Sequence, residues 1–97
     1  MTIQQIRYVI KIAETGSMNR AARMLGIRQP TVSKALAELE HELGIVIFER
    51  APHGMTLTEE GREFLDGASL LAKYFGQLEV RYGVHACYQR NLSSALD

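Results

Sequence analysis

The 97-residue sequence contains almost no cysteine, and this shortage excludes two kinds of site. Cys87 is the only cysteine, so the chain cannot form an intramolecular disulfide bond. A single thiol also leaves no partner for a zinc site built from several thiolates. Such a chain suits a reducing cytoplasm. We therefore expect no disulfide framework, no metal site and no cofactor.

Long hydrophobic runs are also missing from the sequence. No apolar stretch approaches the roughly 20 residues that a helix needs to cross a bilayer. The N-terminus lacks the charged, apolar and small segments of a signal peptide. A chain of 97 residues can form one small domain, or one small domain with a single extended element. We expect a soluble, cytoplasmic protein.

Acidic side chains are absent between Glu14 and Glu38. The whole chain carries 11 basic and 11 acidic residues, so its formal net charge of zero conceals an uneven distribution. The cations in the acid-free interval are Arg20, Arg23, Arg28 and Lys34. A locally basic module of this kind is suited to contact with a phosphate backbone.

The spacing of apolar residues predicts two short helices at the N-terminus. The first covers about residues 2–15, and its predicted inner stripe consists of Ile3, Ile6, Val9, Ile10 and Ala13. Gly16 suits the C-terminal cap of this helix, and Ser17 offers a hydroxyl to the free amides of the next one. Gly26 ends the second helix and suits a tight turn. The predicted buried residues of the second helix are Met18, Ala21, Ala22 and Leu25.

A third helix is predicted from about Gln29 to Leu43, with Pro30 in its first turn. Its inner residues are Val32, Leu36, Leu39 and Leu43. In helix-turn-helix proteins the N-terminal end of the second helix of the motif enters the major groove. The polar residues at this end are Gln29, Thr31, Ser33 and Lys34. They have the chemistry to bond base edges or phosphates, but solvated polar residues at a helix start are the alternative.

A short hairpin, or wing, is predicted after Gly44. One strand covers residues 45–50, residues 51–54 form the turn, and residues 55–57 return. Ile47, Phe48 and Leu57 are expected to close the core. Arg50 and His53 lie near the tip, where they can touch a DNA backbone or a minor groove. For His53, a plain exposed loop histidine is an equal alternative.

A final helix is predicted from the cap residue Thr58 onward, with Glu59 and Glu60 complementing its dipole. An apolar stripe with the spacing of a two-stranded coiled coil follows, made of Phe64, Ala68, Leu71, Phe75, Leu78 and Tyr82. We expect this stripe to pair with a second copy of the chain. The alternative is that it packs on the first helix, as we expect for its early part.

With these residues identified, the chain resembles the N-terminal DNA-binding domain of LysR-type bacterial transcriptional regulators. The resemblance covers about residues 2–80 and is most specific in GSMNRAARMLGIRQPTVSKALAELEHELGIVIFER and the following LTEEG. It implies a mainly α, winged helix-turn-helix fold that dimerises through the linker helix, with further association into tetramers in many members. The positions that it implies for DNA contact are Gln29, Pro30, Thr31, Ser33, Lys34, Arg50 and His53.

Two residues depart from the family pattern. Arg28 stands where Ser or Thr is more common as a helix cap, so we expect a weaker cap and a phosphate contact in its place. Lys34 stands where Arg is common, and lysine lacks the two-pronged fork that recognises guanine. Base specificity at Lys34 therefore stays open.

The predicted organisation is a winged helix-turn-helix domain over residues 1–57, a linker and dimerisation helix over 58–88, and a disordered tail over 89–97. Family members usually continue into a ligand-sensing domain, and no strand of such a domain is evident after the linker helix. We expect no small-molecule effector site on these residues. The sequence is compatible with an excised domain and with a naturally short regulator.

Sequence-specific binding of promoter DNA as a homodimer is the function that these patterns favour, in a bacterial cytoplasm and associated with the nucleoid. The alternative is a dimerisation module that forms mixed oligomers with full-length regulators and interferes with them. An enzyme is the weakest hypothesis, because no motif supplies a nucleophile with a base. The scattered candidates for such chemistry are His41, His53, His85 and Cys87.

Overall fold

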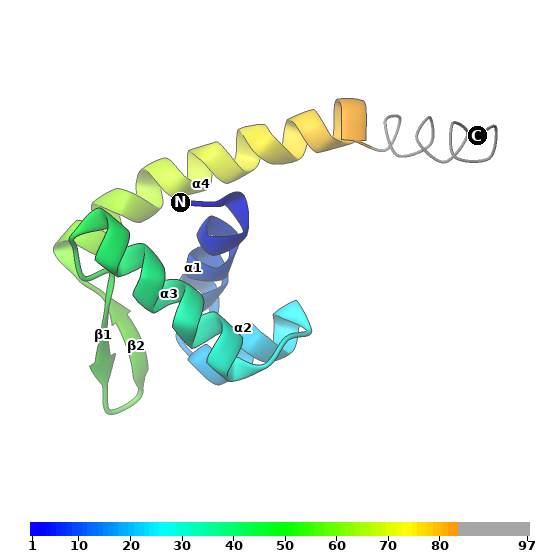
Figure 1. Cartoon of the computed structure of the whole chain (residues 1–97). Helices are drawn as coiled ribbons and strands as arrows, with labels where there is room; N and C mark the ends of the chain where they lie inside the picture. Colours follow the sequence, from blue (N-terminus) through cyan, green and yellow to red (C-terminus); the bar gives the residue numbers. More distant parts are fainter. Residues whose placement is uncertain (84–97) are drawn as a thin grey trace.

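The computed structural model describes residues 1–83 and shows four α-helices, one antiparallel hairpin and a closing π-helical turn in this range. The elements are α1 (Ile3–Thr15), α2 (Met18–Leu25), α3 (Gln29–Leu43), β1 (Phe48–Ala51), β2 (Gly54–Leu57), α4 (Glu59–Leu78) and η1 (Glu79–Gly83). Figure 1 shows α4 running across the group formed by α1, α2 and α3 and continuing beyond it. The order confirms the predicted mainly α fold with a hairpin wing. Residues 84–97, which include the end of the predicted linker helix and the predicted tail, lie outside the described range.

Side-chain caps fix where three of the helices begin. The Thr2 hydroxyl accepts from the Gln5 amide at 3.1 Å, and the Gln5 side chain accepts from the Thr2 amide at 2.9 Å, which makes a capping box. The Ser17 hydroxyl accepts from the Arg20 amide at 3.2 Å, as predicted for α2. Both α1 and α2 end at a glycine in the left-handed conformation. The helix-turn-helix boundaries are therefore encoded locally.

The inner face of α1 differs from its prediction. Tyr8 and Ile12 are buried, whereas Ile3 and Ile10 of the predicted stripe are only half-buried. The cause is that α1 packs against α2, α3 and α4 at once, so its buried face is broader than a single stripe and is turned toward Ile12. The largest side chains that are almost completely buried are Ile12, Leu39, Ile47, Val9 and Val32.

The first strand of the wing begins later than predicted, at Phe48, and the second begins one residue earlier, at Gly54. Phe48 pairs with Leu57 at the base of the hairpin, and Ala51 pairs with Gly54 at its end, so Pro52 and His53 alone form the tip. Residues 45–47 are excluded from the ladder because other groups take their backbone hydrogen bonds. The Ile47 amide donates to the Glu40 carboxylate at 2.6 Å, and the Ile47 carbonyl accepts from the Thr58 amide at 3.0 Å.

The start of α4 lies directly against the backbone of Ile47. The Thr58 hydroxyl caps α4 by accepting from the Gly61 amide at 2.9 Å, and it also contacts the Val46 and Ile47 carbonyls. A Cβ atom placed on Gly61 would come within 2.1 Å of the Ile47 carbonyl oxygen. Only glycine permits this approach, which joins α4 to the base of the wing.

We expect the substitution Gly61→Ala to lower the free energy of unfolding by about 1–3 kcal/mol, because the added methyl group overpacks against a backbone carbonyl. Urea denaturation followed by circular dichroism measures this change. The matched control is Gly76→Ala in the same helix, where an added Cβ meets nothing within 4 Å. Gly76→Ala should raise stability by up to about 1 kcal/mol through helix propensity. Equal effects of the two substitutions would contradict the close approach.

Candidate nucleic-acid interface

The N-terminus of α3 has no side-chain cap, in contrast to α1, α2 and α4. Arg28 occupies the cap position with extended backbone angles, and its carbonyl accepts from the Thr31 amide at 3.0 Å. This agrees with the weak cap expected for Arg28. The positive end of the α3 dipole therefore lies open to an external anion.

The candidate side chains of α3 gather at this same end. Pro30, Thr31 and Lys34 are exposed, and Gln29 and Ser33 are half-buried. Lys34 Nζ lies 4.0 Å from Glu38 Oε1 with both side chains well exposed. An exposed pair of this kind contributes little, so Lys34 remains available to an external acceptor.

The wing brings Arg50 close to the start of α3. Arg50 and Gln29 line one open hollow of about 250 Å³, together with Ser17 and Asn19 from the start of α2. His53 lies at the exposed wing tip, outside this hollow. The hollow thus brings together a candidate residue of α3 and one of the wing, which stand far apart in the sequence. The sequence predicts only a capping role for Ser17 and no role for Asn19. Their position at the start of α2 is the feature that could have indicated both residues.

Two contacts hold the wing against the helices. The Met55 amide donates to the Gly16 carbonyl at 2.9 Å, and a Cβ on Gly54 would come within 2.2 Å of the same oxygen. The Glu40 carboxylate accepts from the Ile47 amide at 2.6 Å and from the Phe48 amide at 3.3 Å. The wing is thereby tied both to the α1–α2 corner and to α3.

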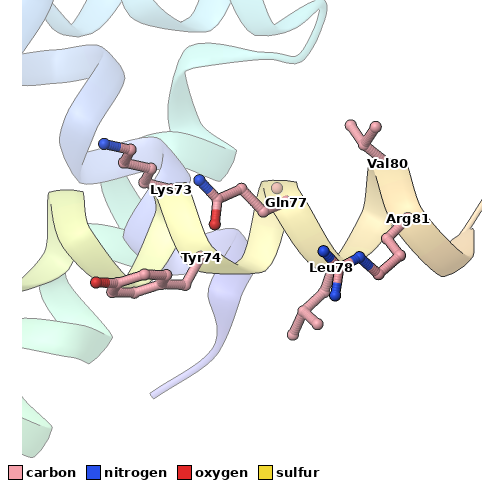
Figure 2. A pocket seen from close by; sticks show the side chains of 7 residues that line it. Lys73, Tyr74, Gln77, Leu78, Val80 and Arg81 are labelled. Carbon is pink, nitrogen blue, oxygen red and sulfur yellow. The ribbon is translucent and has the colours of Figure 1, made fainter.

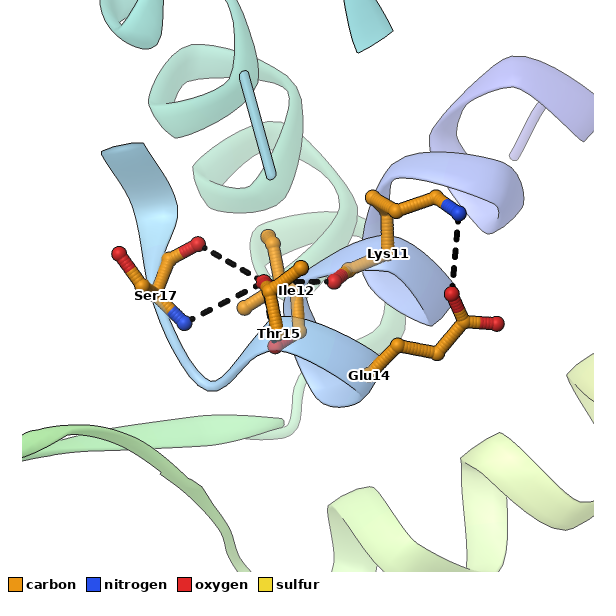
Figure 3. Close-up of polar contacts among 5 residues, drawn as sticks. All are labelled: Lys11, Ile12, Glu14, Thr15 and Ser17. Carbon is orange, nitrogen blue, oxygen red and sulfur yellow. Dashed lines mark hydrogen bonds and ion pairs between the residues drawn. The ribbon is translucent and has the colours of Figure 1, made fainter. Parts of the chain in front are cut away.

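The α1–α2 corner is itself closed by Thr15 (Figure 3). The Thr15 hydroxyl lies 2.8 Å from the Lys11 carbonyl oxygen and 3.0 Å from the Ser17 carbonyl oxygen, and it accepts from the Ser17 amide at 3.4 Å. On the outer side of α1, Lys11 pairs with Glu14 at 2.9 Å. The corner that supports the wing is therefore fixed by short local bonds.

The apolar residues of α4 fall on two sides of the helix. One side faces the core of the chain: Phe64 and Leu65 pack against it, and Ala68 is buried. The other side is exposed and carries Leu70, Leu71, Tyr74 and Leu78, each between 46% and 60% exposed. The predicted seam crosses from one side to the other. It includes Ala68, which its own chain covers, and it omits Leu70 and Tyr74.

Figure 2 shows Tyr74 and Leu78 projecting from one edge of the α4 ribbon, and Lys73 of α4 and Val80 of η1 from the opposite edge. Phe75, a seam residue that is half-buried, has the Arg7 guanidinium carbon 5.1 Å from its ring centroid. Tyr82, the last predicted seam residue, is 57% exposed in η1. The free apolar surface is thus the side that contains Leu70, Leu71, Tyr74 and Leu78, here called the outer face of α4.

No three acidic, histidine or cysteine side chains within residues 1–83 gather where a metal could bind. His41 is exposed in the last turn of α3, and His53 is exposed at the wing tip. His85 and Cys87 lie outside the described residues. In the same range, no helix combines the length and apolar character needed to cross a membrane.

Comparison with known proteins identifies similar chains. Residues 3–62 match the family described as "Bacterial regulatory helix-turn-helix protein, lysR family". The HTH-type transcriptional regulator ClcR of Pseudomonas putida is 44% identical over 71 residues, which cover 73% of this chain and 24% of ClcR. The chain spans between about a quarter and a third of the length of the first curated relatives that it matches.

Two solved structures share the fold. The crystal structure of a CbnR_DBD–DNA complex matches with a TM-score of 0.79 and 35% sequence identity, covering 89% of this chain and 99% of that chain. The BenM_DBD/catB site 1 DNA complex matches with a TM-score of 0.81 and 32% identity, covering 89% and 97% of the two chains. Both matches cover most of this chain, which confirms the predicted fold class.

We expect Glu40→Ala to lower the free energy of unfolding by about 1.5–3 kcal/mol, because two backbone amides lose a charged acceptor. Hydrogen exchange of the Ile47 and Phe48 amides should become faster in this variant, and chemical denaturation measures the stability. Glu38→Ala on the exposed side of the same helix is the control and should change stability by less than about 0.5 kcal/mol. Unchanged exchange at both amides would show that Glu40 does not hold the wing.

Proposed function

Because the chain belongs to the LysR family of bacterial regulatory helix-turn-helix proteins, we propose that it binds specific sequences in double-stranded DNA as a homodimer and so takes part in transcription regulation. The observation that carries the proposal is the surface shared by the open N-terminus of α3 and the wing. Similar chains that have been solved in complex with DNA support it.

The electrostatics of the start of α3 suit a phosphate. Its amides lack a side-chain cap, and the exposed Arg28 adds a full positive charge beside the positive end of the helix dipole. The start of α2 contributes Ser17 and Asn19 to the adjoining hollow. These groups fix the position of a duplex without reading its sequence.

Base recognition is assigned to the side chains that follow. Gln29 has the two-pronged geometry for an adenine edge, Ser33 can bond a base edge or a phosphate, and Thr31 can place its methyl group against thymine. Lys34 acts as a mobile point charge, so it distinguishes bases less sharply than arginine would. We assign the wing residues Arg50 and His53 to the backbone or the adjoining minor groove.

Homodimer formation is assigned to the outer face of α4. Four large apolar side chains stand exposed there on consecutive turns, and burying them against a second copy removes that surface from water. A two-fold pair would present two copies of α3 to two half-sites of a palindromic duplex. Association of two such dimers into a tetramer is compatible with this arrangement.

The exposed outer face also favours a second candidate function, in which the chain pairs with a full-length relative and interferes with it. This activity requires the outer face but not the DNA-contacting side chains. Substitutions at Gln29 and Ser33 would leave such interference intact, whereas a charge at Tyr74 would abolish it. The two candidate functions are therefore separable.

We expect Gln29→Ala and Ser33→Ala each to reduce the preference for a selected duplex over random duplexes by roughly 5-fold to 150-fold, the equivalent of about 1–3 kcal/mol per base contact. Fluorescence anisotropy with labelled duplexes at several salt concentrations measures the preference. The matched control is Ser69→Ala, which removes a hydroxyl group from an exposed position on α4. Retention of the full preference by the α3 variants would refute the assignment.

We expect Tyr74→Asp to convert the dimer into a monomer, because a charge on the outer face must be desolvated in the paired state. Sedimentation velocity at micromolar concentration measures the change. Ser69→Asp introduces the same charge at an exposed position on a different side of α4 and should leave the dimer intact. Two variants with identical sedimentation would place the pairing surface elsewhere.

A further inference from the structure

Arg7 joins the first helix to the far end of the long helix. Its Nη2 donates to the Glu79 carboxylate across 72 residues of sequence, and its guanidinium carbon lies 5.1 Å from the centroid of the Phe75 ring. We propose that Arg7 is a positioning residue that sets the direction of α4 and thereby the half-site spacing recognised by a dimer. This inference rests on the dimeric DNA binding proposed above.

The geometry makes α4 a lever with anchors at three points. Thr58 and Gly61 fix its first turn to Ile47, and Ala68 is buried near its middle. Glu79 lies 18 residues beyond Gly61, which corresponds to about 27 Å of helix. A tilt of about 10° at the first anchor would displace the far end by about 5 Å. A contact at the far end therefore constrains direction more strongly than the same contact near the start.

Within residues 1–83, little else holds this end of α4. Leu78 and Val80 are 56% and 80% exposed, so packing around Glu79 is sparse. Glu79 is also where the α-helix gives way to the π-helical turn, with its amide shared between the Phe75 and Gly76 carbonyls. An exposed ion pair combined with a cation–π contact contributes modestly to folding. It is sufficient to narrow the range of orientations of a helix end around which the described residues pack sparsely.

The direction of α4 determines the half-site spacing because the same helix is attached to the DNA-contacting domain and carries the proposed dimer contact. Its first turn is attached to Ile47, which Glu40 of α3 also binds, and its outer face carries the proposed dimer contact. In a two-fold pair, any change in the angle between α4 and the domain appears twice, once for each copy of α3. Arg7 would then select among operators without touching a base.

The test compares the unaltered protein with Arg7→Ala on duplexes that carry two selected half-sites at spacings varied by single base pairs over one helical turn. Affinity for a duplex with a single half-site is measured in parallel. We expect Arg7→Ala to reduce the ratio between the best spacing and its neighbours by about fivefold or more, with single half-site affinity and melting temperature nearly unchanged. The matched control is Lys11→Ala, which removes a cation that pairs with its neighbour Glu14 on α1 and should keep the ratio.

A charge exchange provides the rescue experiment. Arg7→Glu alone should weaken the spacing preference, and Arg7→Glu combined with Glu79→Arg should restore it, because position 79 lies one helical turn from Phe75 and keeps a cation within reach of the ring. Failure of the exchange to restore the preference overturns the proposal. A parallel loss of single half-site affinity also overturns it, since that result would place Arg7 in the fold or the DNA contact.

A measurement without DNA separates this inference from the proposed function. Spin labels on α2 and α4, introduced by Arg23→Cys and Gln77→Cys in a Cys87→Ser background, report their separation by double electron–electron resonance in a sample diluted with unlabelled protein. We expect a broader distance distribution after Arg7→Ala. An unchanged distribution overturns the role of Arg7. If the unaltered protein selects no duplex while Arg7→Ala still broadens the distribution, the proposed DNA binding and the role of Arg7 in half-site spacing fail, whereas its positioning of α4 stands.

Discussion

The peptide backbone at Ile47 is the junction on which the remaining geometry depends. Its amide donates to Glu40 of α3 at 2.6 Å, its carbonyl accepts from the Thr58 amide at 3.0 Å, and its side chain is fully buried. Gly61 allows the first turn of α4 to rest on the same carbonyl. The candidate recognition helix, the wing and the long helix thus meet at one residue. Because these bonds are partly buried and involve backbone, they hold direction better than exposed side-chain pairs can.

This junction positions the candidate DNA-contacting surface, which is an open surface rather than a deep pocket. A duplex is a long, regular ligand, so its recognition depends on the relative placement of a few elements rather than on enclosure. The contact of Met55 with Gly16 fixes the wing from the other side, next to the corner closed by Thr15. Arg50 is therefore held near Gln29 by contacts of the wing backbone, and the side chains of Arg50 and Gln29 take no part in those contacts.

The sequence predicted those features that are decided locally. Ser17, Gly16 and Gly26 mark helix ends through their own backbone and side-chain chemistry, so the helix-turn-helix boundaries agree with the structure. Tyr8 and Ile12 were missed because α1 packs against three helices at once. The close approaches at Gly54 and Gly61 and the Arg7–Glu79 pair join residues distant in sequence, and no periodicity reports such contacts. The candidate DNA-contacting side chains came from the motif, whereas their union with Ser17 and Asn19 required the fold.

The two apolar sides of α4 explain how pairing can be passed on to DNA recognition. A helix with only a dimer seam would join two chains without fixing the orientation of their DNA-contacting domains. A helix with only a core-facing side would give a monomer. Here Phe64, Leu65 and Ala68 tie α4 to its own domain, while Leu70, Tyr74 and Leu78 remain available to a partner. Both sets lie on one continuous helix, so in the proposed dimer the angle of pairing would be transmitted through the helix backbone to Ile47 and from there to α3. Along that route the end of α4 near Glu79 is sparsely buried, which is why we propose that Arg7 influences the geometry of the dimer.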